Sequence, residues 1–161
     1  RALVTTQSPQ WFETDTRRMV DVTAPDNVLV SGRLAGGAVA SVHVGAMPWA
    51  GGGLRMEFFG REGTLVATGS VSTQRGEMLR VQGARGSHAL ADLPIPDRFD
   101  AVPPEFPRGD PFNVGQMYAL FARSIRTGQA CTPTFDDAVA LHRFVDAIAE
   151  SSERGCEVQL A

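Results

Sequence analysis

The chain has 161 residues, a formal net charge of −3 and a sequence pI near 5.6, and its 43% hydrophobic and 20% charged residues are ordinary for one globular domain. All fifteen basic residues are Arg and lie scattered along the chain, so no basic stripe is available for nucleic acid or for an anionic membrane surface. No apolar run approaches the roughly 20 residues of a transmembrane helix. Without Lys, the chain also has no ammonium group for acid–base chemistry or a Schiff base.

The N-terminal region predicts little regular structure. Ala2–Thr6 is expected to form a short strand, the segment SPQWFETDTRR a polar loop with two aromatic side chains, and Arg18–Thr23 a second short strand. The first residue is Arg, and the apolar run of a secretory signal peptide is missing from this segment. We therefore expect a piece of a longer, cytoplasmic protein that begins upstream of Arg1.

The middle of the chain predicts three antiparallel hairpins, because alternating apolar residues are separated by Gly-containing turns. Without intervening helices, strands at this spacing are typical of a meander. The turns are expected at residues 35–37, 60–63 and 83–86. The expected strand pairs are Val28–Leu34 with Ala38–Val44, Leu54–Phe59 with Thr64–Thr68, and Glu77–Gln82 with Ser87–Leu93.

A connector and an amphipathic helix follow. Residues 94–109 hold five of the ten Pro residues, and Pro has no N–H for a sheet ladder. Asp110 is expected to cap the helix, Pro111 to occupy its first turn, and Gly128 to end it. Its apolar stripe, at a spacing of three and four residues, consists of Val114, Met117, Tyr118, Phe121, Ala122 and Ile125.

A second helix is predicted between Thr134, which with Asp137 forms a short capping box, and Gly155. Residues 157–160 are expected to return as a short strand. The two Cys residues, 131 and 156, bracket this helix. It spans about 30 Å at 1.5 Å per residue, further than a disulfide reaches, so free thiols are expected. Together these elements predict an α+β fold in a single domain of residues 1–161, with an open, mostly antiparallel β-sheet and two C-terminal helices packed on one face.

The motifs that carry cofactor or nucleophile chemistry are missing from the sequence. It has no G-x-G-x-x-G loop, no G-x-S-x-G, and no C-x-x-C or H-E-x-x-H spacing, and the Lys of a P-loop is lacking. We therefore expect no catalytic residue, no cofactor-binding residue and no metal site within this chain.

Four residues are candidates for binding a substrate: Trp11, Arg17, His43 and Trp49. The two Trp residues lie in predicted loops, where an exposed aromatic ring can mark a ligand surface or can simply pin the loop to the core. Arg17 is able to contact an anionic group, although a solvated side chain is the simpler interpretation. His43 lies on a strand, opposite the small apolar face, as a pocket residue or a hydrogen-bonded sheet residue.

Four strings of this sequence, taken in order, resemble the C-terminal domain of the glucose–fructose oxidoreductase / inositol dehydrogenase / MocA family. They are VLVSGRLAGGAVASVHV, FFGREGTL, NVGQMYALFARSIRTG and FDDAVALHRFVDAIAESSERG. The likeness covers nearly the whole chain and is closest to the branch that contains the yeast galactose-regulon repressor.

The resemblance implies a parent protein with an N-terminal Rossmann domain that binds NAD or NADP, and hydride transfer on a sugar, a polyol or a derivative. It also implies that the present domain shapes the substrate pocket and forms a homodimer or tetramer through its sheet face. The family's catalytic Lys and His lie in E-K-P and D-x-x-x-H motifs, and this sequence contains neither. The alternative is a non-catalytic regulator, or a protein-binding module, on the same platform. A third possibility is a stand-alone sheet domain that acts only in assembly.

Overall fold

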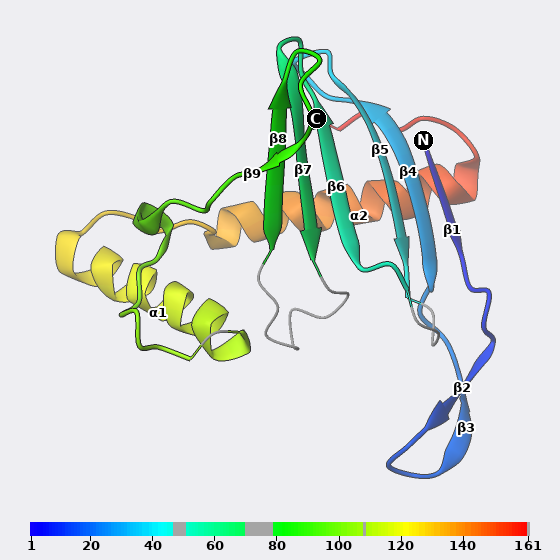
Figure 1. Cartoon of the computed structure of the whole chain (residues 1–161). Coiled ribbons are helices and arrows are strands. Elements are labelled where there is room, and N and C mark those ends of the chain that lie inside the picture. The colour runs from blue at the N-terminus through cyan, green and yellow to red at the C-terminus, as the bar shows by residue number, and fades with distance from the viewer. Residues whose placement is uncertain (47–50, 70–78, 108, 161) are drawn as a thin grey trace. The chain divides into compact units, whose positions relative to one another are not determined.

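The computed structural model describes residues 1–46, 51–69, 79–107 and 109–160, which form two compact units (Figure 1). The first unit comprises residues 1–50 and 132–161, and the second comprises residues 51–131. Mostly antiparallel strands and two helices confirm the predicted α+β fold. In chain order the elements are β1 (Ala2–Thr5), β2 (Gln10–Glu13), β3 (Arg18–Asp21), β4 (Asn27–Arg33), β5 (Val39–Gly45), β6 (Leu54–Phe59), β7 (Gly63–Gly69), β8 (Arg80–Arg85), β9 (Ala91–Asp92), the short 3-10 helix η2 (Asp97–Phe99), α1 (Asp110–Thr127) and α2 (Phe135–Arg154).

The first unit is built on an antiparallel sheet in the order β1-β4-β5. Cross-strand partners share a face, and Leu3, Leu29 and His43 form one row across the three strands. Ser31 and Ser41 pair on the same face, which we call the open face because all five of these residues are exposed. The helix α2 packs against the edge strand β1.

A second hairpin replaces the loop predicted for the segment SPQWFETDTRR. The strands β2 and β3 pair antiparallel and extend from the ends of β1 and β4 (Figure 1). Trp11 lies opposite Val20 and Phe12 opposite Met19, and cross-strand pairs of this kind stabilise a short ladder. Polar residues on both sides of these two apolar pairs obscured the strand pattern in the sequence. The prediction of a loop was therefore wrong.

The second unit contains the antiparallel sheet β6-β7-β8-β9. The strands β6 and β7 agree with the predicted bounds to within one residue, but the turn predicted at residues 83–86 was placed wrongly. Gly83 lies inside β8, opposite Ala91, and not in the turn. A Cβ atom on Gly83 would lie 2.7 Å from Cδ1 of Leu93 and 3.0 Å from Cδ2 of Leu65. The glycine therefore permits these leucines to pack over the strand, and the expected strand at residues 87–93 shortens to β9.

The two faces of this second sheet differ in polarity. One face, called here the apolar face, carries large side chains that are 39–57% exposed: Leu54, Met56, Phe58, Leu65 and Leu93. The opposite face carries two ion pairs, Arg55–Glu57 at 2.6 Å and Arg80–Asp92 at 2.7 Å. Buried Val66, 2% exposed, lies on this polar face, opposite Glu57 and Gln82.

Most of the predicted helix boundaries are confirmed. Gly128 and Gly155 end the helices in the left-handed conformation, with φ of 69° and 62°. Thr134 and Asp137 form the predicted capping box, and the Thr134 backbone N–H lowers the pKa of Asp137. The cap of α1 was predicted one residue too late, because Gly109, with φ of 95°, is the N-cap. Residues 157–160 form no strand.

The connector before α1 is tied to the helix by side chains. The Gln116 amide donates to the carbonyl of Phe99 at 2.6 Å, and its oxygen accepts the Ala101 N–H at 2.5 Å. The ring of Phe106 lies over Gly115, where a Cβ atom would come within 2.9 Å of it. Most of the predicted apolar stripe of α1 is 46–70% exposed: Val114, Met117, Tyr118, Phe121 and Ile125.

Candidate functional site at the base of the β2–β3 hairpin

Asp26, which precedes β4, joins several elements at the base of the hairpin. Its side chain is 3% exposed, and its two carboxylate oxygens accept the backbone N–H groups of Gln7, at 2.8 Å, and Ser8, at 2.7 Å. Its own N–H donates to the carbonyl of Thr5, and its carbonyl accepts the N–H of Ala46. One buried residue therefore holds together the end of β1, the start of the hairpin and the end of β5.

The charge of Asp26 is stabilised by these hydrogen bonds. The N–H groups of Gln7 and Ser8 lower the pKa of the carboxyl group from its ordinary value, and they outweigh the opposing effect of burial. A carboxylate that accepts two backbone N–H groups is an anion with fixed acceptor directions. Asp26 is therefore a negative charge inside the fold at neutral pH.

Asn27 and His43 extend this network to the open face. The Asn27 side-chain nitrogen donates to Oδ1 of Asp26 at 3.3 Å, and Oδ1 of Asn27 lies 3.0 Å from Nε2 of His43. The predicted hydrogen-bonded sheet position of His43 therefore agrees with the structure. Its ring is exposed on β5, next to Leu29 of the open face. His43, a candidate from the sequence, is thus linked through Asn27 to the buried carboxylate of Asp26 by two successive hydrogen bonds.

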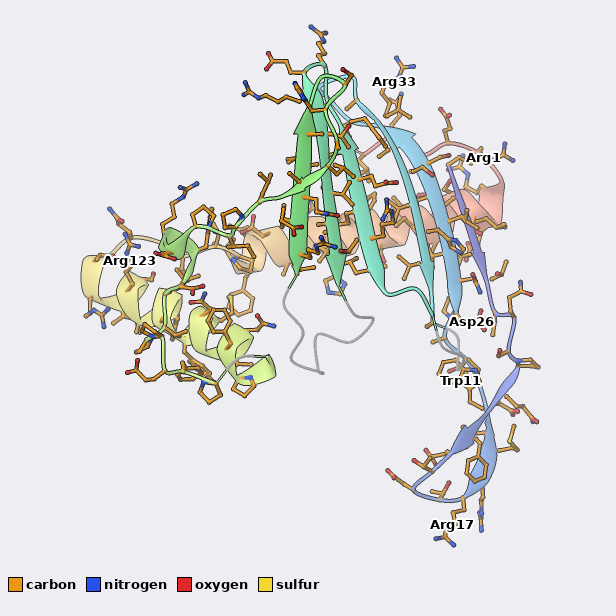
Figure 2. The ribbon with its side chains drawn as sticks, in the orientation of Figure 1. Arg1, Trp11, Arg17, Asp26, Arg33 and Arg123 are labelled. Carbon is orange, nitrogen blue, oxygen red and sulfur yellow. The ribbon has the colours of Figure 1, made fainter. Side chains whose placement is uncertain are left out.

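Trp11 lies at the same end of the hairpin as Asp26 (Figure 2). It is half-buried on β2, and its indole Nε1 atom is buried with no hydrogen-bond partner within the described ranges. A buried indole N–H normally finds a partner. Trp11 therefore offers a donor that the described part of the fold does not use.

The other two sequence candidates are not brought to this site. Arg17 lies at the far end of the hairpin from Trp11 and Asp26 (Figure 2), exposed, with an unusual positive φ of 55°. This left-handed backbone suits the turn between β2 and β3 and is uncommon for a residue with a side chain. Trp49 lies outside the described residues.

Sequence reasoning missed Asp26 and Asn27 as members of a site. The dipeptide Pro25-Asp26 is typical of a turn, and Asp and Asn side chains at turns accept nearby backbone N–H groups, so the sequence contains a general signal for such a role. The partners of Asp26 lie 18 and 19 residues earlier in the chain. A pattern of local residues does not reveal such partners.

At this end of the hairpin, the described structure provides the ring of His43, which is exposed and linked through Asn27 to Asp26, and the indole N–H of Trp11, which is buried and has no partner among the described residues. Ring nitrogens and indole N–H groups are both able to bond to hydroxyl groups. Among the described residues, no group of three or more His, Cys, Asp or Glu side chains is placed to hold a metal ion. Both Cys residues are free, as predicted. No helix in the described part of the chain has the length and hydrophobicity needed to cross a membrane.

The antiparallel sheets and the two helices define a mostly antiparallel α+β fold. The profile of the oxidoreductase family, C-terminal alpha/beta domain, matches residues 4–160. The chain therefore belongs to this oxidoreductase family and corresponds to its C-terminal alpha/beta domain, as the resemblance predicted. A comparison with curated protein sequences gave no match.

Two solved structures share this fold. Levoglucosan dehydrogenase, in complex with NADH and L-sorbose, matches 96% of the chain with a TM-score of 0.74 and 21% sequence identity. A super-repressor mutant of Gal80p from Saccharomyces cerevisiae matches 99% of the chain with a TM-score of 0.72 and 18% identity. The present chain spans only 43% of the length of each of these proteins.

Proposed function

We propose that this chain is the substrate-binding and oligomerisation domain of a cytoplasmic NAD(P)-dependent oxidoreductase that transfers hydride to or from a sugar, a polyol or a derivative. The family match over residues 4–160 is the observation that carries this proposal. The dehydrogenase neighbour, whose structure holds NADH and L-sorbose, supports the substrate class and the cofactor. The two free thiols agree with a reducing compartment.

The dinucleotide would be held by an N-terminal domain, because the residues described here do not fit it. A pyrophosphate favours a helix N-terminus with free N–H groups. The N-terminus of α2 is closed by its own capping box, and Asp136 and Asp137 place negative charge in its first turn. In α1, Pro111 removes one of the N–H groups. This domain would therefore bind and orient the substrate, while the reacting nicotinamide comes from the other domain.

The experiment that tests this division uses the chain alone and the two-domain protein. The fluorescence of NADH and NADPH is expected to stay unchanged when the isolated chain is added, and tight binding by the chain would contradict the proposal.

In the two-domain protein, Trp11→Phe removes the indole N–H and keeps the aromatic ring. We expect this variant to raise KM for the polyol with little change in kcat. The matched control is Arg17→Gln, at the far end of the hairpin, which should leave KM unchanged.

Self-association is proposed to use the apolar face of β6–β9. Five large side chains that are 39–57% exposed, on one face of a sheet, are typical of an interaction surface. Phe58 lies on this face, whereas its neighbour Phe59, also exposed, lies on the opposite one. Phe58→Glu is expected to lower the molar mass seen by light scattering after size-exclusion chromatography, and Phe59→Glu is the matched control. A wild-type chain that is monomeric at high concentration would contradict the proposed self-association.

The exposed stripe of α1 is proposed to contact the N-terminal dinucleotide-binding domain. An amphipathic helix in a folded protein normally buries such a stripe, and more than half of each related chain lies outside the part matched here. In the two-domain protein, Phe121→Glu is expected to separate the unfolding of the two domains. Arg123→Glu, two residues along the same helix (Figure 2), should leave them coupled. If Phe121→Glu lowers the molar mass of the isolated chain in solution, the stripe would instead contact a second copy of this chain.

A regulator without catalytic activity is the second candidate, since Gal80p shares the fold. The residues that discriminate the two functions lie outside this chain. E-K-P and D-x-x-x-H motifs in the preceding domain, together with activity of the two-domain protein, would support the oxidoreductase. Their absence, with retained binding of a protein partner, would support the regulator.

A further inference from the structure

We propose that Asp26 and Asn27 are positioning residues that hold His43 with its proton on Nε2 and present its Nδ1 atom as an acceptor for a hydroxyl group of the ligand. The inference deepens the proposed function and rests on it for the identity of the ligand. The tautomer itself follows from the hydrogen bonds within the chain.

The first step is the orientation of Asn27. The carboxylate of Asp26 only accepts hydrogen bonds, and the Asn27 side chain lies 3.3 Å from its Oδ1 atom. The amide nitrogen, which donates, therefore faces Asp26. The amide oxygen must point the other way, and it lies 3.0 Å from the imidazole of His43.

The second step is the tautomer of His43. An amide oxygen only accepts, so the ring nitrogen that faces it, Nε2, must carry a proton. In the neutral imidazole the other nitrogen, Nδ1, is then an acceptor. The exposed ring presents this acceptor on the open face of β1-β4-β5.

The third step is the ligand. His43 shares its row with uncharged Leu3 and Leu29, and the next row of the open face holds uncharged Ser31 and Ser41. In these surroundings, an acceptor atom pairs with a hydrogen-bond donor and repels an anion. A sugar or polyol hydroxyl meets this requirement. The backbone N–H groups of Gln7 and Ser8 hold Asp26 in place from the hairpin, so the hairpin base and the ligand acceptor form one connected network.

The test is the tautomer of His43 in the chain at pH 8, measured by long-range 1H–15N correlation spectroscopy without ligand. The exposed residues His88 and His142 provide internal references. We expect a single tautomer with the proton on Nε2 for His43, and a mixture for the references. A mixture at His43, or a proton on Nδ1, would overturn the proposal. This measurement needs no substrate, so its failure is distinct from failure of the proposed function.

Variants test the positioning role. Asp26→Asn removes the anion that orients Asn27, and Asn27→Ala removes the acceptor, so both should shift His43 toward the mixture expected at His88 and His142. Asp21→Asn, which changes a carboxylate that accepts a hydrogen bond from Gln10 on the hairpin, should keep the single tautomer. If Asp26→Asn does not fold, Asn27→Ala by itself tests the positioning role. An unchanged His43 signal in Asn27→Ala would overturn the proposal.

The ligand is tested by adding L-sorbose to the 15N-labelled chain. We expect the Nδ1 signal of His43 to move with sugar concentration at fixed protein concentration. A signal that moves only with protein concentration would mean that a second copy of the chain occupies the acceptor, and it would overturn the assignment to a sugar hydroxyl.

Discussion

The hydroxyl oxygen of Ser151 on α2 lies 2.9 Å from the backbone nitrogen of Ala2, a residue 149 positions earlier, and accepts its N–H. Ser152 accepts the N–H of Val4 in the same way, at 2.8 Å. These N–H groups point away from β4, on the free edge of β1. An uncovered edge is a template for pairing with other chains. The last turns of α2 therefore close this edge of the sheet.

Ser151→Ala tests the closed edge. The buried hydroxyl also donates to the carbonyl of Cys156 at 2.6 Å, so the substitution leaves two backbone groups without a partner. We expect a loss of about 1–3 kcal/mol in the free energy of unfolding, measured with urea. Faster hydrogen exchange of the Ala2 amide should accompany it. Ser41→Ala, an exposed position on β5, is the control, and an equal loss there would contradict the role of the edge.

Thr134→Ala tests the capping box of α2. The hydroxyl of Thr134 accepts the N–H of Asp137 at 3.2 Å, and the Asp137 carboxylate accepts the N–H of Thr134 at 2.7 Å. Removing an N-cap hydroxyl costs about 1 kcal/mol. We expect that loss in thermal unfolding followed by circular dichroism, and Thr134→Ser should restore most of it. If Ser did not restore stability, the hydroxyl would not be the cause.

Gly63→Ala tests the close approach of two backbones in the second sheet. A Cβ atom on Gly63 would lie 2.1 Å from the carbonyl oxygen of Ala84, so the strands β7 and β8 must separate locally. Overpacking of this kind costs about 1–3 kcal/mol, occasionally more. Gly32→Ala, also in a strand but with no atom within 4 Å of the new Cβ, is the matched control. Urea unfolding should show a loss in the free energy of unfolding for Gly63→Ala and none for Gly32→Ala.

Asp26→Asn tests the acid dependence of stability. Because hydrogen bonds lower the pKa of Asp26 in the folded chain, the unfolded chain binds more protons between the two pKa values. This contribution to stability is fully present when the pH is above the pKa of Asp26 in the unfolded chain, about 3.9. It is lost as the pH falls through the lower pKa of Asp26 in the folded chain. The difference in stability between wild type and Asp26→Asn should therefore narrow below about pH 4. Urea titrations from pH 7 to pH 2 measure it, and a constant difference would contradict the linkage.

Local chemistry explains why much of the fold could be predicted. The hairpin strands before and after residues 35–37 and 60–63, and the ends of both helices at Gly128 and Gly155, depend on residues that are neighbours in sequence. The strand predicted at Arg18–Thr23 corresponds to β3, but β2 and its pairing with β3 were missed because the two apolar cross-strand pairs are flanked by polar residues. Gly83 was misread as a turn residue, although its role is to leave space for Leu65 and Leu93, which are distant in sequence.

The candidate site was predicted only in part, because its connections are long-range. His43 was identified as a candidate from its place on a strand, whereas Asp26 and Asn27 gained a role only when the chain brought residues 7, 8, 26, 27 and 43 together. The sequence by itself determined most of the helix and strand positions, the family resemblance and the lack of a phosphate loop, since these depend on residue types and short spacings. Only the tertiary structure decided which polar groups meet, because a hydrogen bond forms between atoms within about 3 Å, whatever their separation along the chain.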